Sequence, residues 1–556
     1  MTGTPLLMCR KSCKTNQKSF AALNPPQHGG KMGRNRRGTG AWGKPDTVLQ
    51  GAYPLRSAPN NRGRMANLMK KQVSLLLAAL LLLGVMGGCT QSAPPPTATP
   101  TPAQESPSAP PATEIALSKA YIIVQGYEWG PAIPKIVLEF AEDVSGFASD
   151  TFEVAFGSTK RTVKDVYSSD EDGNKAEGAG KHLTIEMAVK SSEASPFAYN
   201  MEKNVNTWAE QVDFTVTVAS GKSFSVGGTA YQGGDLCSYS ATAADRKVPQ
   251  TASWVKDTVE YHEEGKDITL TRAAWAPEGA DSDSGKNPLI IWLHGMGEGG
   301  TDIDIDLLGN EVTALTTENE TNVQKYFATD GLAGAYVLAV QTPTMWMDID
   351  GNSTFNNENL TLPAKQESWY TGALWHAITS YVEGNPDVDT SRIYVGGCSN
   401  GGYMTMNMMF EHGGYFAAFY PICEAYLNDC VSDEMVQQVK DYNIWFVQSA
   451  DDGTVNPSEY GLPTYVRLLE AGAQNVWFTL SDHVRGTDDP EPWSWTGTGT
   501  YDGHWSWIYA FNDQVTTRID TAKVASVADL TPENCTVTDV NLWQWMSQQS
   551  LPQAAE

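Results

Sequence analysis

The chain has 556 residues, of which 41% are hydrophobic and 19% charged, so it is globular in composition and too long for one ordinary domain. Its net charge of −27 is unevenly distributed: residues 1–88 contain 14 Lys or Arg and one acid, whereas the remainder contains 24 basic and 64 acidic residues. A body this acidic repels phosphate backbones, which argues against nucleic-acid binding.

The basic region ends in a sequence typical of export signals. Residues 65–90 read MANLMKKQVSLLLAALLLLGVMGGCT, with two lysines, an apolar run over 73–86 and small residues before Cys89. The run has the length of a secretory signal core and is short for a membrane span. The small residues before Cys89 resemble a bacterial lipoprotein cleavage site, although Met86 replaces the usual Leu. We expect 65–88 to be a lipoprotein signal peptide and Cys89 to be lipidated, which predicts an exported protein anchored at the cell surface. An ordinary signal peptide or anchor helix is the alternative.

The segments on either side of this signal contain nothing that predicts a packed core. Residues 1–64 are polar and rich in Arg and Gly, and we interpret them as a non-native or disordered extension, with translation starting at Met65 or Met69. Residues 89–113 are rich in Pro, Ser and Thr, which favours an extended, semi-rigid spacer.

Residues 114–245 contain short β-rich segments separated by Gly, Asp, Ser or Pro. The clearest are KAYIIVQGY, PKIVLEF, TFEVAF, HLTIEMAV and DFTVTV. Segments of this length and spacing predict an antiparallel β-sandwich of immunoglobulin-like size.

Residues 255–548 have a different sequence pattern, in which predicted apolar strands alternate with predicted helices. Predicted strands include DITLTRAAWAP, NPLIIWLHG, AYVLAVQTP, RIYVGG, NIWFVQSA and VWFTL, and predicted helices include SWYTGALWHAITSYVEG and PTYVRLLEAGA. This alternation predicts an α/β domain with a doubly wound, mostly parallel sheet. In such sheets, functional residues follow the carboxyl ends of the strands.

The sequence GCSNG at 397–401 fits the G-x-S-x-G pattern between a strand, RIYV, and a Met-rich helix. In a nucleophile elbow the Ser occupies a strained turn, and the small neighbours allow strand and helix to approach each other. We therefore interpret Ser399 as a nucleophile. The alternative is a glycine-rich packing turn with a capping Ser.

A serine nucleophile needs a histidine base and an acid to orient it. The strand IWFVQS is followed by two adjacent candidates for the acid, Asp451 and Asp452. Two histidines come later, and we favour His504, because it lies on a loop just before the apolar SWIYAF. His483 closely follows a strand, where it would cap the strand or shape the rim of the site.

The strand LIIWL leads directly into His294, Gly295, Met296 and Gly297. The absence of a Cβ at Gly295 lets the backbone curl so that an amide, that of Met296, faces the nucleophile. Together with the amide of Asn400 it would form an oxyanion hole, in which each donor is worth about 3 kcal/mol to the transition state. His294 precedes the nucleophile and sits at a turn, so we expect it and Gly297 to support the loop.

These motifs resemble those of the α/β-hydrolase superfamily, in LHGMGEGGTD, RIYVGGCSNGGY, FVQSADDGTV and GHWSWIYAFND. With AYIIVQGYEWGPAIPKIVL in the N-terminal part, the chain is similar over about residues 117–546 to serine esterases that carry an N-terminal immunoglobulin-like domain, in the polyhydroxybutyrate-depolymerase and feruloyl-esterase-like group. The resemblance implies a serine hydrolase with a buried triad and without metal or organic cofactor. In the family the acid stands four residues after a His at the strand end. Gln448 occupies that place here, so the resemblance implies Asp452.

The cysteines of the folded part allow disulfide bonds, but the sequence does not give their pairing. Five follow Cys89, an odd number that permits two disulfides without giving the pairing: Cys237, Cys398, Cys423, Cys430 and Cys535. Some feruloyl-esterase relatives pair the Cys before the nucleophile with a Cys beside the catalytic His. Trp505 occupies that second place here, so that pairing is not expected.

The sequence thus predicts hydrolysis of carboxylic esters through Ser399, His504 and Asp452, on a small-molecule or polysaccharide-linked substrate. Plant-polysaccharide and feruloyl-type esters are candidates, because aromatic loops suit a flat or sugar-linked group. Aromatic side chains near a site are equally often part of the core or of the rim of the site. The residues concerned are Trp346, Trp493, Trp495, Trp505 and Trp507. One alternative is a serine peptidase of prolyl-oligopeptidase type, which would need a propeller or an anionic group for a peptide amine. Another is a non-catalytic surface binding lipoprotein.

Overall fold

The computed structural model describes residues 112–552, apart from 192, 194, 264, 318–320, 354–366, 490–498, 524–525 and 527–529. The predicted extension, signal peptide, lipidated Cys89 and nearly all of the spacer lie outside the described residues. Pro107–Glu556 form one compact unit. Among the helices of the described part, none is both long and apolar enough to cross a membrane.

The N-terminal part is an all-β sandwich, as predicted. One sheet has the strand order β14-β1-β2-β7-β6, a second β13-β10-β4-β5 and a third β12-β11-β3, beside a hairpin of β8 and β9. Alternate residues point into the core; in β4, for example, Phe152, Val154 and Phe156 are buried. The strands are β1 Lys119–Tyr127, β2 Gly130–Glu139, β3 Val144–Ser145, β4 Phe152–Phe156, β5 Thr159–Arg161, β6 Val163–Ser169, β7 His182–Met187, β8 Phe197–Asn200, β9 Val205–Trp208, β10 Val212–Val218, β11 Ser223–Val226, β12 Thr229–Gln232, β13 Leu236–Ala241 and β14 Arg246–Lys247.

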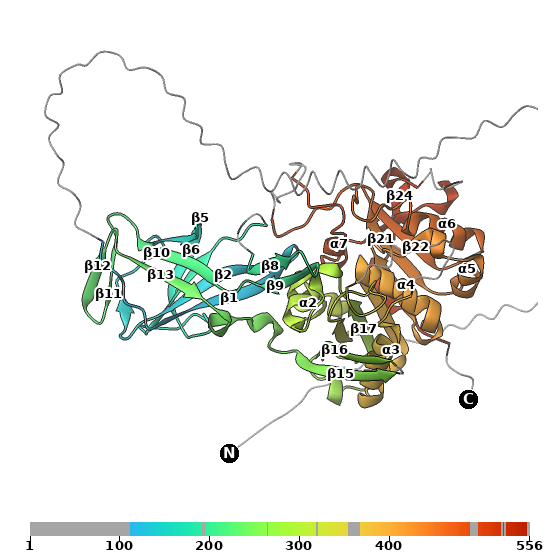
Figure 1. Cartoon of the computed structure of the whole chain (residues 1–556), viewed down its shortest axis with the longest axis horizontal. Coiled ribbons are helices and arrows are strands. Elements are labelled where there is room, and N and C mark those ends of the chain that lie inside the picture. Colours follow the sequence, from blue (N-terminus) through green and yellow to red (C-terminus); the bar gives the residue numbers. More distant parts are fainter. Residues whose placement is uncertain are drawn as a thin grey trace, which may run out of the picture. The chain divides into compact units, whose positions relative to one another are not determined.

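The C-terminal part is built on an eight-stranded sheet with the order β15-β16-β18-β17-β19-β20-β21-β22. Figure 1 labels β15, β16, β17, β21 and β22 of this sheet. From β18 to β22 every neighbouring pair is parallel, whereas β15 and β16 form an antiparallel edge. The strands are β15 Val255–Glu263, β16 Lys266–Trp275, β17 Asn287–Leu293, β18 Tyr336–Gln341, β19 Val388–Cys398, β20 Ala418–Ile422, β21 Ile444–Ser449 and β22 Val476–Ser481. The mostly parallel sheet is therefore confirmed.

Along the central strands, successive side chains belong alternately to two clusters of buried side chains. In β17, Leu289, Ile291 and Leu293 belong to one cluster, and Ile290 and Trp292 to the other. Both faces of the sheet are thus covered, which explains why these strands are continuously apolar. The α-helices are α2 Ile303–Gly309, α3 Thr371–Gly384, α4 Asn400–His412, α5 Asp433–Val439, α6 Gly461–Glu470, α7 Trp507–Phe511 and α8 Leu542–Ser547.

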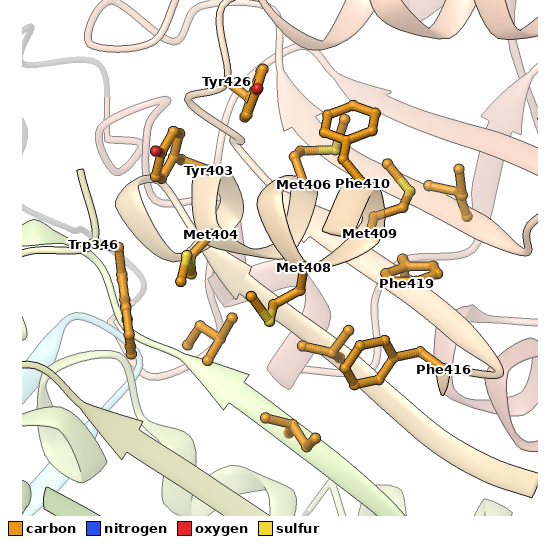
Figure 2. Close-up of a cluster of buried hydrophobic side chains, with 14 of the residues drawn as sticks. Trp346, Tyr403, Met404, Met406, Met408, Met409, Phe410, Phe416, Phe419 and Tyr426 are labelled. Carbon is orange, nitrogen blue, oxygen red and sulfur yellow. The ribbon is translucent and has the colours of Figure 1, made fainter. Parts of the chain in front are cut away.

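The Met-rich helix α4 lies in the core of this domain. Met404, Met406, Met408 and Met409 are all fully buried, and Figure 2 shows them pointing to different sides of the helix among aromatic side chains. Unbranched thioether side chains fill irregular gaps well, which suits a helix packed all round. The helix is thereby held firmly, and the residue before it, Ser399, is held with it.

Candidate active site

Ser399 lies in a strained turn between β19 and α4, with φ 56° and ψ −113°. Such a conformation is costly for a residue with a side chain and persists only where the surroundings enforce it. Here, a Cβ at Gly397 or at Gly401 would overlap the carbonyl oxygen of Leu293 in β17. The two glycines allow strand and helix to close on that oxygen, and the turn presents the half-buried Ser399 at the strand end.

Asp452 and His504 form a hydrogen-bonded pair, in which His504 Nδ1 lies 2.9 Å from Asp452 Oδ2. The carboxylate is buried and also accepts hydrogen bonds from the amides of Thr454 (2.9 Å) and Val455 (2.8 Å) and from Gln448 Nε2 (3.3 Å). These donors hold the carboxylate in one position, and the carboxylate in turn fixes the orientation of the imidazole. Gln448, for which no role was predicted, thus supports Asp452 directly.

The neighbouring residues form a second, separate pair. His483 Nδ1 lies 2.8 Å from Asp451 Oδ2, and their side chains are 43% and 37% exposed. The corresponding values for His504 and Asp452 are 13% and 0%. Adjacent side chains at the end of β21 thus diverge to two different histidines, and only the pair of Asp452 and His504 is shielded from water.

The thiol of Cys423 is the other partner of His504. Cys423 follows β20 with φ 37°, is fully buried, and hydrogen-bonds to the imidazole. In the described residues no hydrogen bond joins the imidazole to the Ser399 hydroxyl. Burial lowers the pKa of His504, but the charge and hydrogen bond of Cys423 and those of Asp452 outweigh it and raise the pKa well above its usual value. Only the adjacency of β19 and β20 brings Cys423 here, so the sequence analysis missed it.

Among the described residues, Cys423, Asp452 and His504 form a group that could hold a metal ion, because their ligand atoms lie within 4.8 Å of one another. Thiolate, carboxylate and imidazole are the ligand types of zinc. The same imidazole and carboxylate already bind each other, however, so a metal ion here would compete with the hydrogen bond between His504 and Asp452.

The loop in which we expect the oxyanion hole directly follows β17. Gly295 caps a short 3-10 helix, Met296–Glu298, whose first amide belongs to Met296, and the amide of Asn400 is the first of α4. Amides in the first turn of a helix have no acceptor within that helix, so they remain available to an oxyanion. The side chain of Asn400 orders the neighbouring loop, because its Oδ1 accepts from the amides of Trp346 (2.5 Å) and Met347 (3.3 Å).

His294 supports this loop from within. It is fully buried, its Nδ1 lies 2.5 Å from the Gly295 carbonyl oxygen, and its Nε2 accepts from the Thr342 amide at 3.1 Å. Burial lowers the pKa of His294 to about 4, so the ring is neutral near pH 7. A neutral ring with both nitrogens engaged suits the supporting role that the sequence analysis gave it.

Glu298, at the end of the same loop, is contacted by the immunoglobulin-like domain. Asn206 Nδ2 in β9 donates to Glu298 Oε1 at 3.3 Å. Burial raises the pKa of Glu298 to about 7, and the glutamate also interacts electrostatically with His504. The N-terminal domain therefore reaches the loop that would carry the oxyanion hole.

A second contact from that domain reaches the segment before His504. Glu128, in the turn between β1 and β2, is fully buried and accepts hydrogen bonds from the amides of Thr487 (2.8 Å) and Asp488 (3.1 Å). The Tyr501 hydroxyl (2.6 Å) and Asn512 Nδ2 (2.7 Å) donate to the same carboxylate. No motif marks Glu128, because its partners lie about 360 residues further along the chain.

The other predicted residues divide into three groups. Trp505 and Trp507 line a cavity beside the site, whereas Trp346 is fully buried next to His294 and is a core residue. Trp493 and Trp495 lie outside the described residues. No disulfide is formed among the five cysteines of the described part, which are Cys237, Cys398, Cys423, Cys430 and Cys535.

Residues 119–232 match the family model of the esterase Ig-like N-terminal domain. The chain has no match among the curated proteins compared with it. A thermostable esterase of known structure is 20% identical, with a TM-score of 0.55, over 78% of this chain and 100% of its own. Two other solved structures are a ferulic acid esterase (14% identical, TM-score 0.30, 41% of this chain and 91% of its own) and an acylaminoacyl peptidase of Pyrococcus horikoshii (13%, 0.29, 66% and 51%). The last two likenesses are too weak to inform the fold.

The first likeness shows the fold, and the family match identifies the domain in front of it. The chain thus has the fold of that thermostable esterase, with an N-terminal domain that matches the immunoglobulin-like domain model of esterases.

Proposed function

We propose that this protein is a serine esterase that hydrolyses carboxylic esters through an acyl-enzyme intermediate formed on Ser399. One observation carries the proposal: a serine in a strained strand–helix turn shares one end of the sheet with a buried Asp452–His504 pair. This is the set of groups that nucleophilic acyl transfer requires.

In the proposed reaction, Ser399 Oγ attacks the ester carbonyl while His504 accepts its proton and Asp452 keeps the imidazole oriented. The amides of Met296 and Asn400 stabilise the oxyanion, and His504 then protonates the departing alcohol. Water, activated by the same imidazole, releases the acid. Catalytic hydrogen bonds often shorten only once substrate is bound, so the missing contact between Ser399 and His504 is compatible with this sequence of steps.

Substrate assays test the ester assignment against the peptidase alternative. We expect turnover of p-nitrophenyl esters of short acids by the wild type and loss of that turnover in Ser399→Ala. Aminoacyl p-nitroanilides should remain intact. Turnover of the anilides without the esters would assign the site to a peptidase, and no turnover of either would favour a binding protein.

We further propose that the enzyme is exported and anchored by a lipid on Cys89, which would present the site to small-molecule or polysaccharide-linked esters outside the cell. Residues 65–89 and the spacer after them support this. In the producing bacterium, the wild type should sediment with membranes and Cys89→Ser should be released. Equal distribution of the two proteins would refute the anchor.

A further inference from the structure

Cys423, whose thiol adjoins the proposed base, is held firmly at the end of the sheet. It directly follows β20, it is fully buried, and its amide donates to the Val447 carbonyl oxygen of β21 at 2.8 Å. The Ser399 amide donates to the carbonyl oxygen of Ile422, the residue before Cys423, at 2.9 Å. The thiol and the nucleophile therefore belong to adjacent strand ends that are bonded to each other.

The imidazole of His504 has a partner at each of its two nitrogens. Asp452 Oδ2 lies 2.9 Å from Nδ1, so Nε2 is the nitrogen left for the Cys423 thiol, which hydrogen-bonds to the ring. One ligand atom from each of the three residues lies within 4.8 Å of the others. The side chain of His504 is 13% exposed and that of Asp452 is 0% exposed, so a small ion reaches this group along the imidazole.

A thiol beside an imidazole nitrogen is a pair of ligands for a thiophilic cation. Zinc that bonds to sulfur at about 2.3 Å and to nitrogen at about 2.0 Å in tetrahedral geometry separates these two atoms by about 3.5 Å. A thiol that is hydrogen-bonded to an imidazole has a similar separation, so the pair can take up the cation without a large movement. A carboxylate on the other ring nitrogen is the usual support of a metal-binding histidine, and Asp452 occupies that place.

We propose that Cys423 and His504 form an inhibitory site for thiophilic divalent cations such as Zn²⁺, with Asp452 retained on the far side of the imidazole. A cation that bound all three side chains would break the hydrogen bond between Asp452 and His504, whereas binding at Nε2 and Sγ keeps it. The thiol proton passes to solvent as the metal–sulfur bond forms. The cation then occupies the nitrogen that would accept the proton of Ser399, so hydrolysis stops.

The charge of the chain and the number of ligands determine how such a cation arrives and leaves. Residues 89–556 contain 24 basic and 64 acidic residues, and a field of this sign attracts cations. Structural zinc sites have four protein ligands, whereas this site has two, so binding is reversible and a chelator restores the base. The inference goes beyond the proposed esterase function, because the cation binds whether or not an ester is hydrolysed.

Cobalt binding tests the site in the full-length protein without any substrate. Co²⁺ takes the same ligands as Zn²⁺ and absorbs in the near ultraviolet when it is bonded to a thiolate. We expect Cys423→Ala to lose this absorption in part and to bind one Co²⁺ fewer per chain in equilibrium dialysis. Cys430→Ala is the matched control, since Cys430 is also a buried cysteine of the same domain, and it should behave as the wild type. Equal binding and absorption in Cys423→Ala would overturn the proposal.

Inhibition of p-nitrophenyl ester hydrolysis tests the consequence for the base. Zn²⁺ should inhibit the wild type and Cys430→Ala, EDTA should restore both, and Mg²⁺ should have no effect because it prefers oxygen ligands. With each rate expressed relative to the metal-free rate of the same protein, half-inhibition of Cys423→Ala should need at least about tenfold more Zn²⁺. Cys423→Ser, which keeps the size of the side chain, should show the same rise if Cys423→Ala folds poorly.

His483→Ala separates this site from the exposed pair of His483 and Asp451. It should leave the inhibition by Zn²⁺ as in the wild type. Loss of inhibition in His483→Ala, with full inhibition of Cys423→Ala, would assign the cation to the exposed pair and overturn the proposal. These outcomes are distinct from failure of the esterase function. If no ester is hydrolysed, the esterase function is wrong, and the cobalt measurements alone decide whether the cation binds at Cys423.

Discussion

The carboxylate of Glu128, in the immunoglobulin-like domain, accepts a 2.6 Å hydrogen bond from the hydroxyl of Tyr501, three residues before His504. Both residues are buried, and the same carboxylate also binds two amides and Asn512. A Cβ at Gly486 would overlap the Glu128 carboxylate, so the segment before His504 closes tightly around it. The N-terminal domain is thus bonded to the segment that carries the proposed base.

Replacing Glu128 with Ala should therefore impair both stability and catalysis. The change leaves several buried donors without an acceptor, which should cost about 3 kcal/mol of unfolding free energy. Looser positioning of His504 should lower kcat about tenfold or more. Urea unfolding and steady-state kinetics measure the two effects.

The matched control is Glu153→Ala, which removes an exposed glutamate of the same domain that pairs with Lys160. An exposed ion pair contributes about 0–1 kcal/mol, so kcat should stay as in the wild type. An active, stable Glu128→Ala protein would show that this contact does not position the loop.

Adjacent aspartates provide a sharp test of the proposed triad. Asp452→Asn should lower kcat by about 10⁴, because an amide no longer holds the imidazole in the required tautomer. Asp451→Asn, at the exposed pair with His483, should keep kcat within about fivefold, as for a typical surface substitution. The reverse order of effects would transfer the role to Asp451 and His483.

Removal of the Cys423 thiol should change the pH dependence of the reaction. His504 acts as a base only when neutral, so activity falls as the pH drops below its pKa. Cys423 raises that pKa, and Cys423→Ala should therefore move the acidic limb of kcat/KM to lower pH. The control is Cys430→Ala, at a buried cysteine that is not among the groups that shift the pKa of His504, and it should leave the limb in place. A shift to higher pH in Cys423→Ala would contradict the assignment.

Glu424 should make the stability of the protein fall with rising pH. Burial raises its pKa to about 8 from an ordinary value of 4.5, and its Oε1 has no hydrogen-bond partner among the described residues. The folded state therefore keeps a proton that the unfolded chain releases, so the associated stability is fully present below pH 4.5 and is lost as the pH rises through about 8.

Glu424→Gln removes this titration while keeping an acceptor for the Tyr426 amide, which donates to Glu424 Oε2 at 2.6 Å. Its Tm relative to the wild type should be higher at pH 8.5 than at pH 4. Glu470→Gln, at an exposed residue of α6, should show no such dependence. A constant difference in Tm for Glu424→Gln would contradict the buried, protonated carboxyl.

The architecture was largely predictable because both domains have strong periodic signals. The strands of the central sheet are buried on both faces, so they appear as continuous apolar runs, and the turn at Ser399 requires the glycines that the pattern contains. The antiparallel edge of the sheet was harder to predict from the sequence, because β15 is mostly exposed and has a weak apolar pattern.

Most residues of the proposed site were predictable from strand ends, and His504 from its loop before the apolar SWIYAF. His294, Ser399 and Asp452 stand at or near the ends of β17, β19 and β21, so chain order and strand ends located them. Strand position alone did not separate Asp451 from Asp452, and the choice of Asp452 came from the family resemblance, because the two side chains differ in burial and partner. Cys423, Glu128 and Asn206 depend on contacts between distant segments and have no local signal.

Covalent labelling tests the central claim most directly. A fluorophosphonate reacts with a serine only if a neighbouring base activates the hydroxyl. We predict that the intact protein gains one phosphonyl group, found by mass spectrometry on the peptide that contains Ser399, and that Ser399→Ala gains none. An unlabelled wild type, or equal labelling of Ser399→Ala, would contradict a nucleophile at this turn.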